Sequence, residues 1–141
     1  MSAENVAASR RFMEEAFNKG NLGVVDELCA EDFVNHDPLM GDQDKDAGKE
    51  SIASYRQAFP DLHADIEEMI DAGDTVVYRW SANGTFENEI MGLQPTHEKG
   101  DPVKGITIDR YEGGELVESW SQWDTLTFMR DIGAVPAAAA S

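Results

Sequence analysis

The sequence predicts an α+β domain in which a curved sheet wraps around helices from the first half of the chain. Apolar residues recur at helical spacing in the first half, whereas residues 62–128 alternate between apolar and polar side chains as strands do. Helices segregated from a mostly antiparallel sheet are typical of this class. A bent sheet over a long helix forms a cone with an apolar interior, which is a common place for a small-molecule site.

Three helices are expected in the first half of the chain, over residues 3–18, 22–29 and 48–59. Pro60 ends the third helix, because proline cannot continue it without cost. Between the second and third helices, residues 31–39 read as a short extended segment stopped by Pro38. The polar, glycine-bearing stretch 41–49 is expected to be mostly loop.

The second half is expected to be a sheet, with strands over residues 62–70, 75–86, 103–111 and 115–128. DAGD and EGGE supply tight turns between paired strands. Residues 87–102 read as a loop, and a short helix is expected over about 125–132, where the last strand ends. Residues 1–141 should form one domain, with about 135–141 as a disordered tail.

The charge and cysteine content restrict the classes of partner. The net charge of −17 argues against nucleic acid and anionic membranes, which need a basic face, and favours uncharged or apolar ligands. Cys29 is the only cysteine, so no internal disulfide forms, and its apolar neighbours indicate a buried thiol. No stretch has the pattern of a signal peptide or the length of a membrane helix, so a cytoplasmic protein is expected.

Several motifs occur in series along the chain: DELCAEDFVNHDP, then AFPDLHADIEEMIDAGDTVVYRWSANGTF, then MGLQPTHEKGDPVKGITIDRYEGGELVESWSQWDTL. In this order the chain resembles the SnoaL-like polyketide cyclases of the nuclear transport factor 2-like superfamily. The resemblance implies a cone-shaped α+β barrel, a homodimer through the outer face of the sheet, and a small apolar carbonyl compound as ligand. It also implies an intramolecular aldol-type ring closure of a polyketide ester, assisted by a cavity acid without metal or organic cofactor. The matching acid is Asp124.

The last strand supplies an independent reason to consider Asp124. Strict alternation places Trp120, Gln122 and Asp124 on one face, beside Leu116 and Glu118. An indole next to a carboxyl in a partly dry setting would raise the carboxyl pKa towards the range useful for proton transfer. The competing interpretation is that Asp124 is the N-cap of the final helix, since Asp is a favoured cap.

Two further residues are candidates for stabilising developing oxyanion charge. Arg110 follows Ile106 and Ile108 on one strand face, so it either holds a substrate oxygen or pairs with Glu118 across the hairpin. His36 should lie near the mouth of the cone. It either polarises the substrate or fixes its loop by hydrogen bonding.

The candidate substrate-binding residues are large or polar side chains on the expected inner surfaces: Trp120, Gln122, Tyr55, Phe59, Phe33 and Phe86. Ordinary core packing is the alternative for the aromatic ones. Phe86 stands where the family pattern often has His, which favours a different substrate or a binding role. The three histidines are too scattered for a metal site.

Two other functions remain open. A carrier would hold a lipophile in the cavity without chemistry. The other is an enzyme of the same superfamily, an epoxide hydrolase or a ketosteroid isomerase-like catalyst, and for the hydrolase Asp124 and Arg110 could supply two of the three groups needed around one water. The hydrolase needs a second carboxylate, and Ile108 occupies the position two before Arg110. The phosphate-binding and nucleophile-elbow patterns are absent from the sequence.

Overall fold

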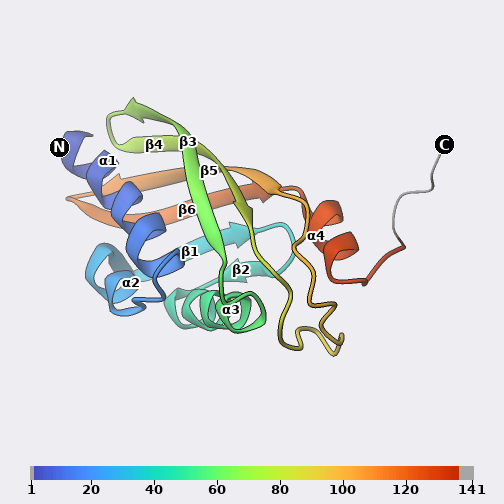
Figure 1. Ribbon diagram of the computed structural model, residues 1–141. Coiled ribbons are helices and arrows are strands. Elements are labelled where there is room, and N and C mark those ends of the chain that lie inside the picture. Colours follow the sequence, from blue (N-terminus) through green and yellow to red (C-terminus); the bar gives the residue numbers. More distant parts are fainter. Residues whose placement is uncertain (1, 137–141) are drawn as a thin grey trace.

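A computed structural model describes residues 2–136 and shows one curved, unclosed sheet with helices on its concave side (Figure 1). The strands are β1 (Cys29–Asp37), β2 (Gly41–Gln43), β3 (His63–Ala72), β4 (Thr75–Asn83), β5 (Val103–Glu112) and β6 (Glu115–Trp123). Their order is β2-β1-β6-β5-β4-β3, in which β1 runs parallel to β6 and every other neighbouring pair is antiparallel. The predicted α+β class with a curved, mixed sheet is confirmed.

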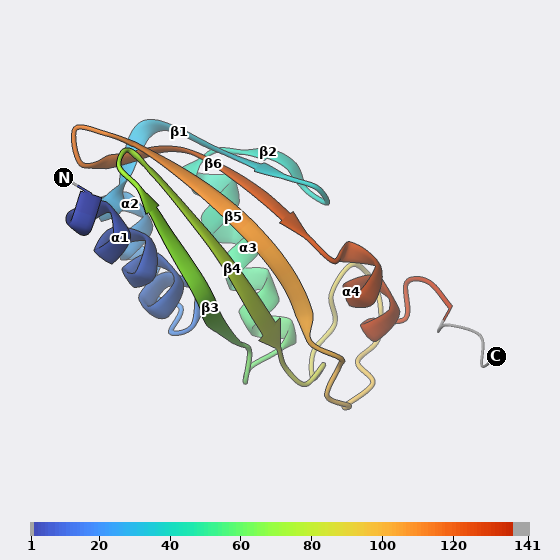
Figure 2. The same cartoon turned by 90° about the horizontal axis from the view of Figure 1, so that it is seen from above.

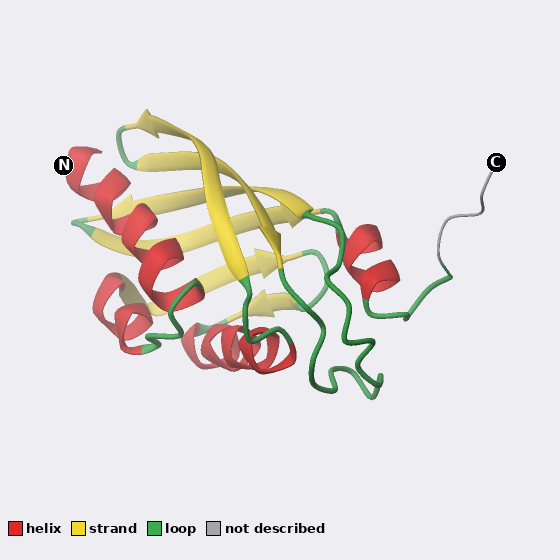
Figure 3. Ribbon diagram, in the orientation of Figure 1, coloured by secondary structure: helices red, strands yellow, loops and turns green. Residues whose placement is uncertain are grey.

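The helices are α1 (Ser2–Arg11), the π-helix η1 (Phe12–Phe17), α2 (Gly23–Leu28), α3 (Lys45–Ala58) and α4 (Thr125–Asp131). The first four lie under the concave face of the sheet, whereas α4 lies beyond the end of β6 (Figures 2 and 3). The helix expected over 3–18 is therefore continuous but widens into a π-helix in its second half. Among the described residues, no helix is long and apolar enough to cross a membrane.

The stretch 41–49 is more ordered than its composition indicated. Residues 41–43 form β2, whose Gln43 pairs with Asn35 of β1. The Asp44 side chain accepts a hydrogen bond of 2.8 Å from the Ala47 amide, so α3 begins at Lys45 rather than Gly48. The tail expected over 135–141 falls mostly on residues 137–141, outside the described part of the chain.

A β-bulge in β6 changes which of its side chains face inward. Tyr111 of β5 pairs with Leu116 and Arg110 pairs with Glu118, so one extra residue, Val117, lies between them. Leu116 points inward, and after the bulge the inward set becomes Ser119, Ser121 and Trp123. The expected inward face of Trp120, Gln122 and Asp124 is therefore wrong, because alternation does not continue through a bulge.

Strand β5 presents its less apolar side to the interior. Thr107, Asp109 and Tyr111 are buried, whereas Ile106 and Ile108 are 51% and 38% exposed on the outer face. The inward placement expected for the two isoleucines, and for Arg110 with them, is wrong. Apolar character did not mark the interior here, because the inner wall of this strand is polar and the outer face carries the aliphatic side chains.

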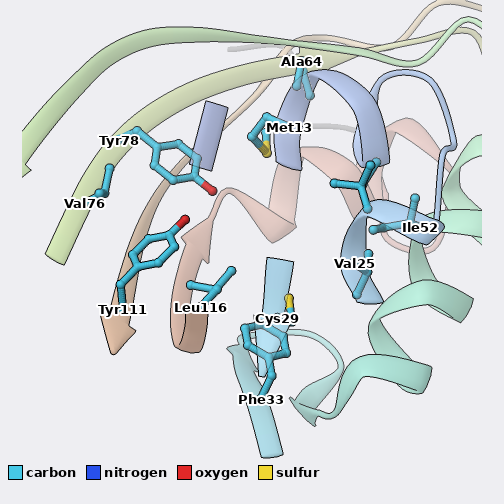
Figure 4. Close-up of a cluster of buried hydrophobic side chains, with 13 residues drawn as sticks. Met13, Val25, Cys29, Phe33, Ile52, Ala64, Val76, Tyr78, Tyr111 and Leu116 are labelled. Carbon is cyan, nitrogen blue, oxygen red and sulfur yellow. The ribbon is translucent and has the colours of Figure 1, made fainter. Parts of the chain in front are cut away.

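Two apolar clusters occupy the concave side of the sheet. The larger joins η1, α2 and the middle of α3 to the inner faces of the strands, and Figure 4 shows its members converging. The smaller joins the end of α3, the loop after β4 and α4, with buried residues Ala58, Phe59, Phe86, Ile90, Phe128 and Ile132. The helices and the sheet therefore pack at both ends of the cone, and the space between them is available for a cavity.

Candidate active site

A cavity of about 200 Å³ lies between the helices and the inner face of the sheet. Its walls are mostly apolar and come from η1, α3 and the inward side chains of the strands. Prominent lining residues are Phe12, Phe17, Phe33, Ile52, Tyr55, Phe59, Tyr78, Trp80, Trp123 and Phe128. Polar side chains also reach the lining, and those that could orient a ligand or take part in chemistry are candidates for function. They are Asn35, Asp37, Gln43, Lys45, Asn83, Asp101, Thr107, Asp109, Ser119, Ser121 and Asp131.

Asp37 is a carboxylate at one end of the cavity. It is the last residue of β1, and its Oδ1 accepts a hydrogen bond of 2.9 Å from the indole N–H of Trp123. Its Oδ2 accepts from the backbone amides of Leu39 and Met40, at 2.9 and 2.8 Å. These donors fix the carboxylate in one orientation, and Oδ1 retains a free lone pair because it accepts one hydrogen bond.

Tyr55 lies in the same part of the cavity. Its ring packs edge-on against Phe128, which in turn packs edge-on against Trp123. The Tyr55 hydroxyl is buried and has no hydrogen-bond partner within residues 2–136. Burial raises the pKa of this phenol above its usual value, and the charge of Asp37 adds to the increase, so the hydroxyl is a neutral donor at physiological pH.

Asp109 is another carboxylate of the lining, on the central part of β5 and only 2% exposed. Its oxygens accept hydrogen bonds from Ser9 of α1 at 2.7 Å and from Ser119 of β6 at 2.6 Å. Burial raises the pKa of Asp109, while the hydrogen bonds from Ser119, Ser9 and Tyr78 act in the opposite direction. Because its partners come from α1, β4 and β6, Asp109 connects the helix to the sheet and closes this part of the cavity.

Asp124 caps the final helix, which is the competing interpretation that the sequence left open. Its side chain accepts hydrogen bonds from the amide of Thr127 at 3.0 Å and from the Thr127 hydroxyl at 2.6 Å, which makes it the N-cap of α4. The same bonds hold the pKa of Asp124 below its usual value. Asp124 is exposed and does not line the cavity, so the expected pairing with Trp120 in a dry interior is wrong.

The other two residues expected around the reacting oxygen lie on the outer face. His36 stacks on Trp120 with ring centroids 5.5 Å apart, and its nitrogens lie 2.6 Å from Glu118 and 2.7 Å from Asp42. Arg110 pairs with Glu118 at 2.9 Å, as the alternative interpretation of the hairpin predicted. The cavity positions expected for His36 and Arg110 are wrong, because both side chains project from the convex side of the sheet.

The six expected binding residues divide into three groups. Tyr55, Phe59 and Phe33 line the cavity. Trp120 is 39% exposed and Gln122 is also exposed, both on the outer face. Phe86 is buried in the smaller cluster, where it stacks on Phe59 at 5.4 Å, so it supports the cavity wall from behind.

Asp37 and Asp109 are the residues that sequence reasoning missed. Asp37 follows His36 directly, in a segment already considered as part of the mouth, but its contact with Trp123 joins residues 86 positions apart. Asp109 lies on the same face of β5 as Gly105 and Thr107. A strand face made of these small or polar residues was the available signal that the carboxylate points inward.

The remaining candidates for chemistry are weaker. Burial raises the pKa of the Cys29 thiol to about 12, as fits an inert buried cysteine. Across residues 2–136, no three His, Cys, Asp or Glu side chains are grouped as metal ligands would be. The cavity thus offers an acceptor at Asp37, a free donor at Tyr55 and an apolar enclosure for both.

Comparison with known proteins agrees with this architecture. IdmH from Streptomyces antibioticus, a candidate polyketide cyclase, is 28% identical, and the match covers 91% of this chain and 97% of that one with a TM-score of 0.77. AclR from Streptomyces galilaeus, a candidate hydroxylase, is 22% identical over 99% of this chain and 87% of that one, with a TM-score of 0.86. At this identity AclR shows the fold alone. No curated protein matches the chain.

The sequence profile described as SnoaL-like polyketide cyclase matches residues 7–132. This range includes the helices η1, α2, α3 and α4 and all six strands. The chain therefore belongs to the SnoaL-like polyketide cyclase family.

Proposed function

We propose that this protein catalyses a cofactor-independent, acid/base ring closure of a small, mostly apolar carbonyl compound of the polyketide type, with Asp37 as the proton acceptor. The observation that carries the proposal is the oriented Asp37 carboxylate in the wall of a mostly apolar cavity. Family membership and the likeness to IdmH, a candidate polyketide cyclase, support the reaction class.

The chemistry needs one mobile proton. Asp37 Oδ1 takes a proton from the carbon next to a substrate carbonyl, and the C–H electron pair becomes an enolate. The enolate carbon attacks a second carbonyl carbon of the same molecule and forms the ring bond. The resulting alkoxide takes the proton back from Asp37, so the step balances without another reactant. A positioned acid/base of this kind contributes about 10²–10⁴-fold to rate.

The cavity and the surface charge restrict the substrate. A cavity of about 200 Å³ is smaller than the roughly 300–1,000 Å³ usual for drug-sized ligands, so the substrate has one or two rings inside the cavity. The net charge of −17 disfavours an anionic substrate. A neutral, compact keto compound fits both properties.

Proton abstraction can be measured without knowing the natural substrate. We expect the protein to accelerate exchange of the α-protons of 2-tetralone in D₂O, followed by NMR. Asp37→Asn should slow this exchange by about 10²-fold or more, because the amide cannot accept the proton. Asp124→Asn decides between the two carboxylates and should exchange at the wild-type rate.

The outcomes separate the competing functions. Exchange lost in Asp124→Asn and retained in Asp37→Asn would return the catalytic role to Asp124. Saturable binding of 2-tetralone without any accelerated exchange in the wild-type protein would favour the carrier function instead.

The proposed enzyme is a homodimer in which the outer faces of two sheets meet. Ile106, Ile108 and Trp120 form an exposed apolar group at the centre of that face. Arg110 and His36 beside it are already paired with carboxylates, so this part of an otherwise strongly acidic surface has little unpaired charge. Like-charge repulsion between two copies is therefore smallest where these residues meet.

A further inference from the structure

The Tyr55 hydroxyl is unusual among the polar groups of the interior. Within residues 2–136 it is the one buried side-chain oxygen or nitrogen without a hydrogen-bond partner. The other two tyrosines differ in this respect, because Tyr111 hydrogen bonds to Ser9 at 2.7 Å and Tyr78 hydrogen bonds to Asp109. A buried hydroxyl without a partner costs stability, and an acceptor on a bound ligand would remove that cost.

The surroundings of Tyr55 indicate the chemistry of that partner. The ring is held between the apolar cavity and Phe128, with centroids 5.7 Å apart and the planes nearly perpendicular. Burial and the nearby Asp37 both raise the pKa of Tyr55, so the hydroxyl keeps its proton and acts as a donor. An acceptor without a proton of its own, such as a carbonyl oxygen, is the natural complement of such a donor.

We propose that Tyr55 donates a hydrogen bond to the carbonyl oxygen of the bound ligand. For its ligand class the inference rests on the proposed function. When Asp37 removes a proton, negative charge develops on that oxygen, and a donor already in place stabilises it without reorganisation. Tyr55 is then the specificity-determining group that distinguishes a ketone from a hydrocarbon of the same shape.

A stability comparison gives the first test and needs no ligand. Tyr55→Phe removes a hydroxyl with no partner, so the ligand-free variant should melt at the wild-type temperature or above it. Tyr111→Phe is the matched control, since it removes a hydroxyl that is bonded to Ser9 and should lower the melting temperature. A clear loss of stability in Tyr55→Phe alone would mean that the hydroxyl is structural and would overturn the inference.

The second test detects the hydrogen bond directly. 2-Tetralone labelled with ¹³C at the carbonyl is bound to the protein, and its carbonyl stretch is recorded by infrared difference spectroscopy. We expect a lower frequency in the wild-type protein than in Tyr55→Phe, and binding weakened about 2–10-fold by the substitution. Tyr111→Phe should leave frequency and affinity unchanged.

Equal frequencies in wild type and Tyr55→Phe would overturn the inference. The result is independent of turnover: a Tyr55-dependent shift without accelerated proton exchange would disprove the proposed catalysis and leave the ligand contact standing. Accelerated proton exchange without a Tyr55-dependent change in carbonyl frequency would support the proposed catalysis and disprove the ligand contact of Tyr55.

Discussion

Three aspartates of this chain have different roles because their surroundings differ. Asp124 caps a helix in solvent, and Asp109 is buried and bonded on several sides by hydroxyl groups of the protein. Asp37 lies between these extremes, with donors that orient it and an apolar cavity in front of it. Residue type alone could not separate them, because the distinction lies in which side of each carboxylate remains free.

His36 allows a pH prediction at the same scale. Hydrogen bonding to Glu118, and secondarily to Asp42, raises the pKa of His36 above its usual value of 6.5. Stability from these contacts is therefore fully present below pH 6.5 and is lost as pH rises through the folded-state pKa. NMR titration should place the His36 midpoint above 6.5 in the wild-type protein, and Glu118→Gln should lower it.

The melting temperature supplies the second measurement for His36. His36→Gln should lower the melting temperature most near about pH 6, with a difference that shrinks at higher pH. A difference that grows with pH, or a wild-type midpoint at or below 6.5, would contradict the assigned contacts.

At the scale of elements, α4 depends on its first residue. α4 is short, and short helices need caps and packing because their own propensity is insufficient. Asp124 supplies the cap, and Phe128 anchors the helix in the smaller cluster next to Tyr55 and Trp123. α4 therefore holds one wall of the cavity from outside the sheet.

Asp124→Ala should destabilise the protein by about 1 kcal/mol at neutral pH, because the Thr127 amide loses its acceptor. The pKa of Asp124 is lowered by folding, so this contribution is present above its unfolded-state value of 3.8 and disappears as pH falls through the folded-state pKa. Urea denaturation at two pH values measures both effects. Asp124→Ser is the control and should keep most of the stability, and an unchanged urea midpoint in Asp124→Ala would exclude the cap.

At the scale of the whole molecule, the two faces of the sheet differ in character, and we propose a function for each. Its concave face encloses the cavity, and its convex face carries Ile106, Ile108 and Trp120. We expect sedimentation to report twice the chain mass of 15.5 kDa. Ile108→Lys should shift the protein to the monomer, because it buries an unpaired charge in the interface.

Leu126→Lys is the matched control for that experiment. Leu126 is an equally apolar side chain that is 50% exposed on α4, away from the convex face, and its substitution changes the net charge by the same amount. It should sediment as the wild-type protein does. A wild-type protein that remains monomeric at high concentration would disprove the dimer.

The sequence by itself determined the class of fold, the order of helices and strands apart from β2, and the family, because these depend on local periodicity and on motifs in series. It also indicated Tyr55, Phe59 and Phe33 as inward side chains, since all three are large aromatic residues and Tyr55 and Phe59 recur at helical spacing. These signals are read within one element and do not depend on what lies opposite.

Only the tertiary structure decided which carboxylate faces the cavity. The extra residue Val117 changes which alternate side chains of β6 point inward. This bulge is visible only in the pairing of β6 with β5, so alternation within the strand cannot reveal it. The site likewise joins Asp37 of β1 to Trp123 of β6 and to Tyr55 of α3. A carboxylate is given its role by neighbours distant in sequence, and those contacts exist only when the chain is folded.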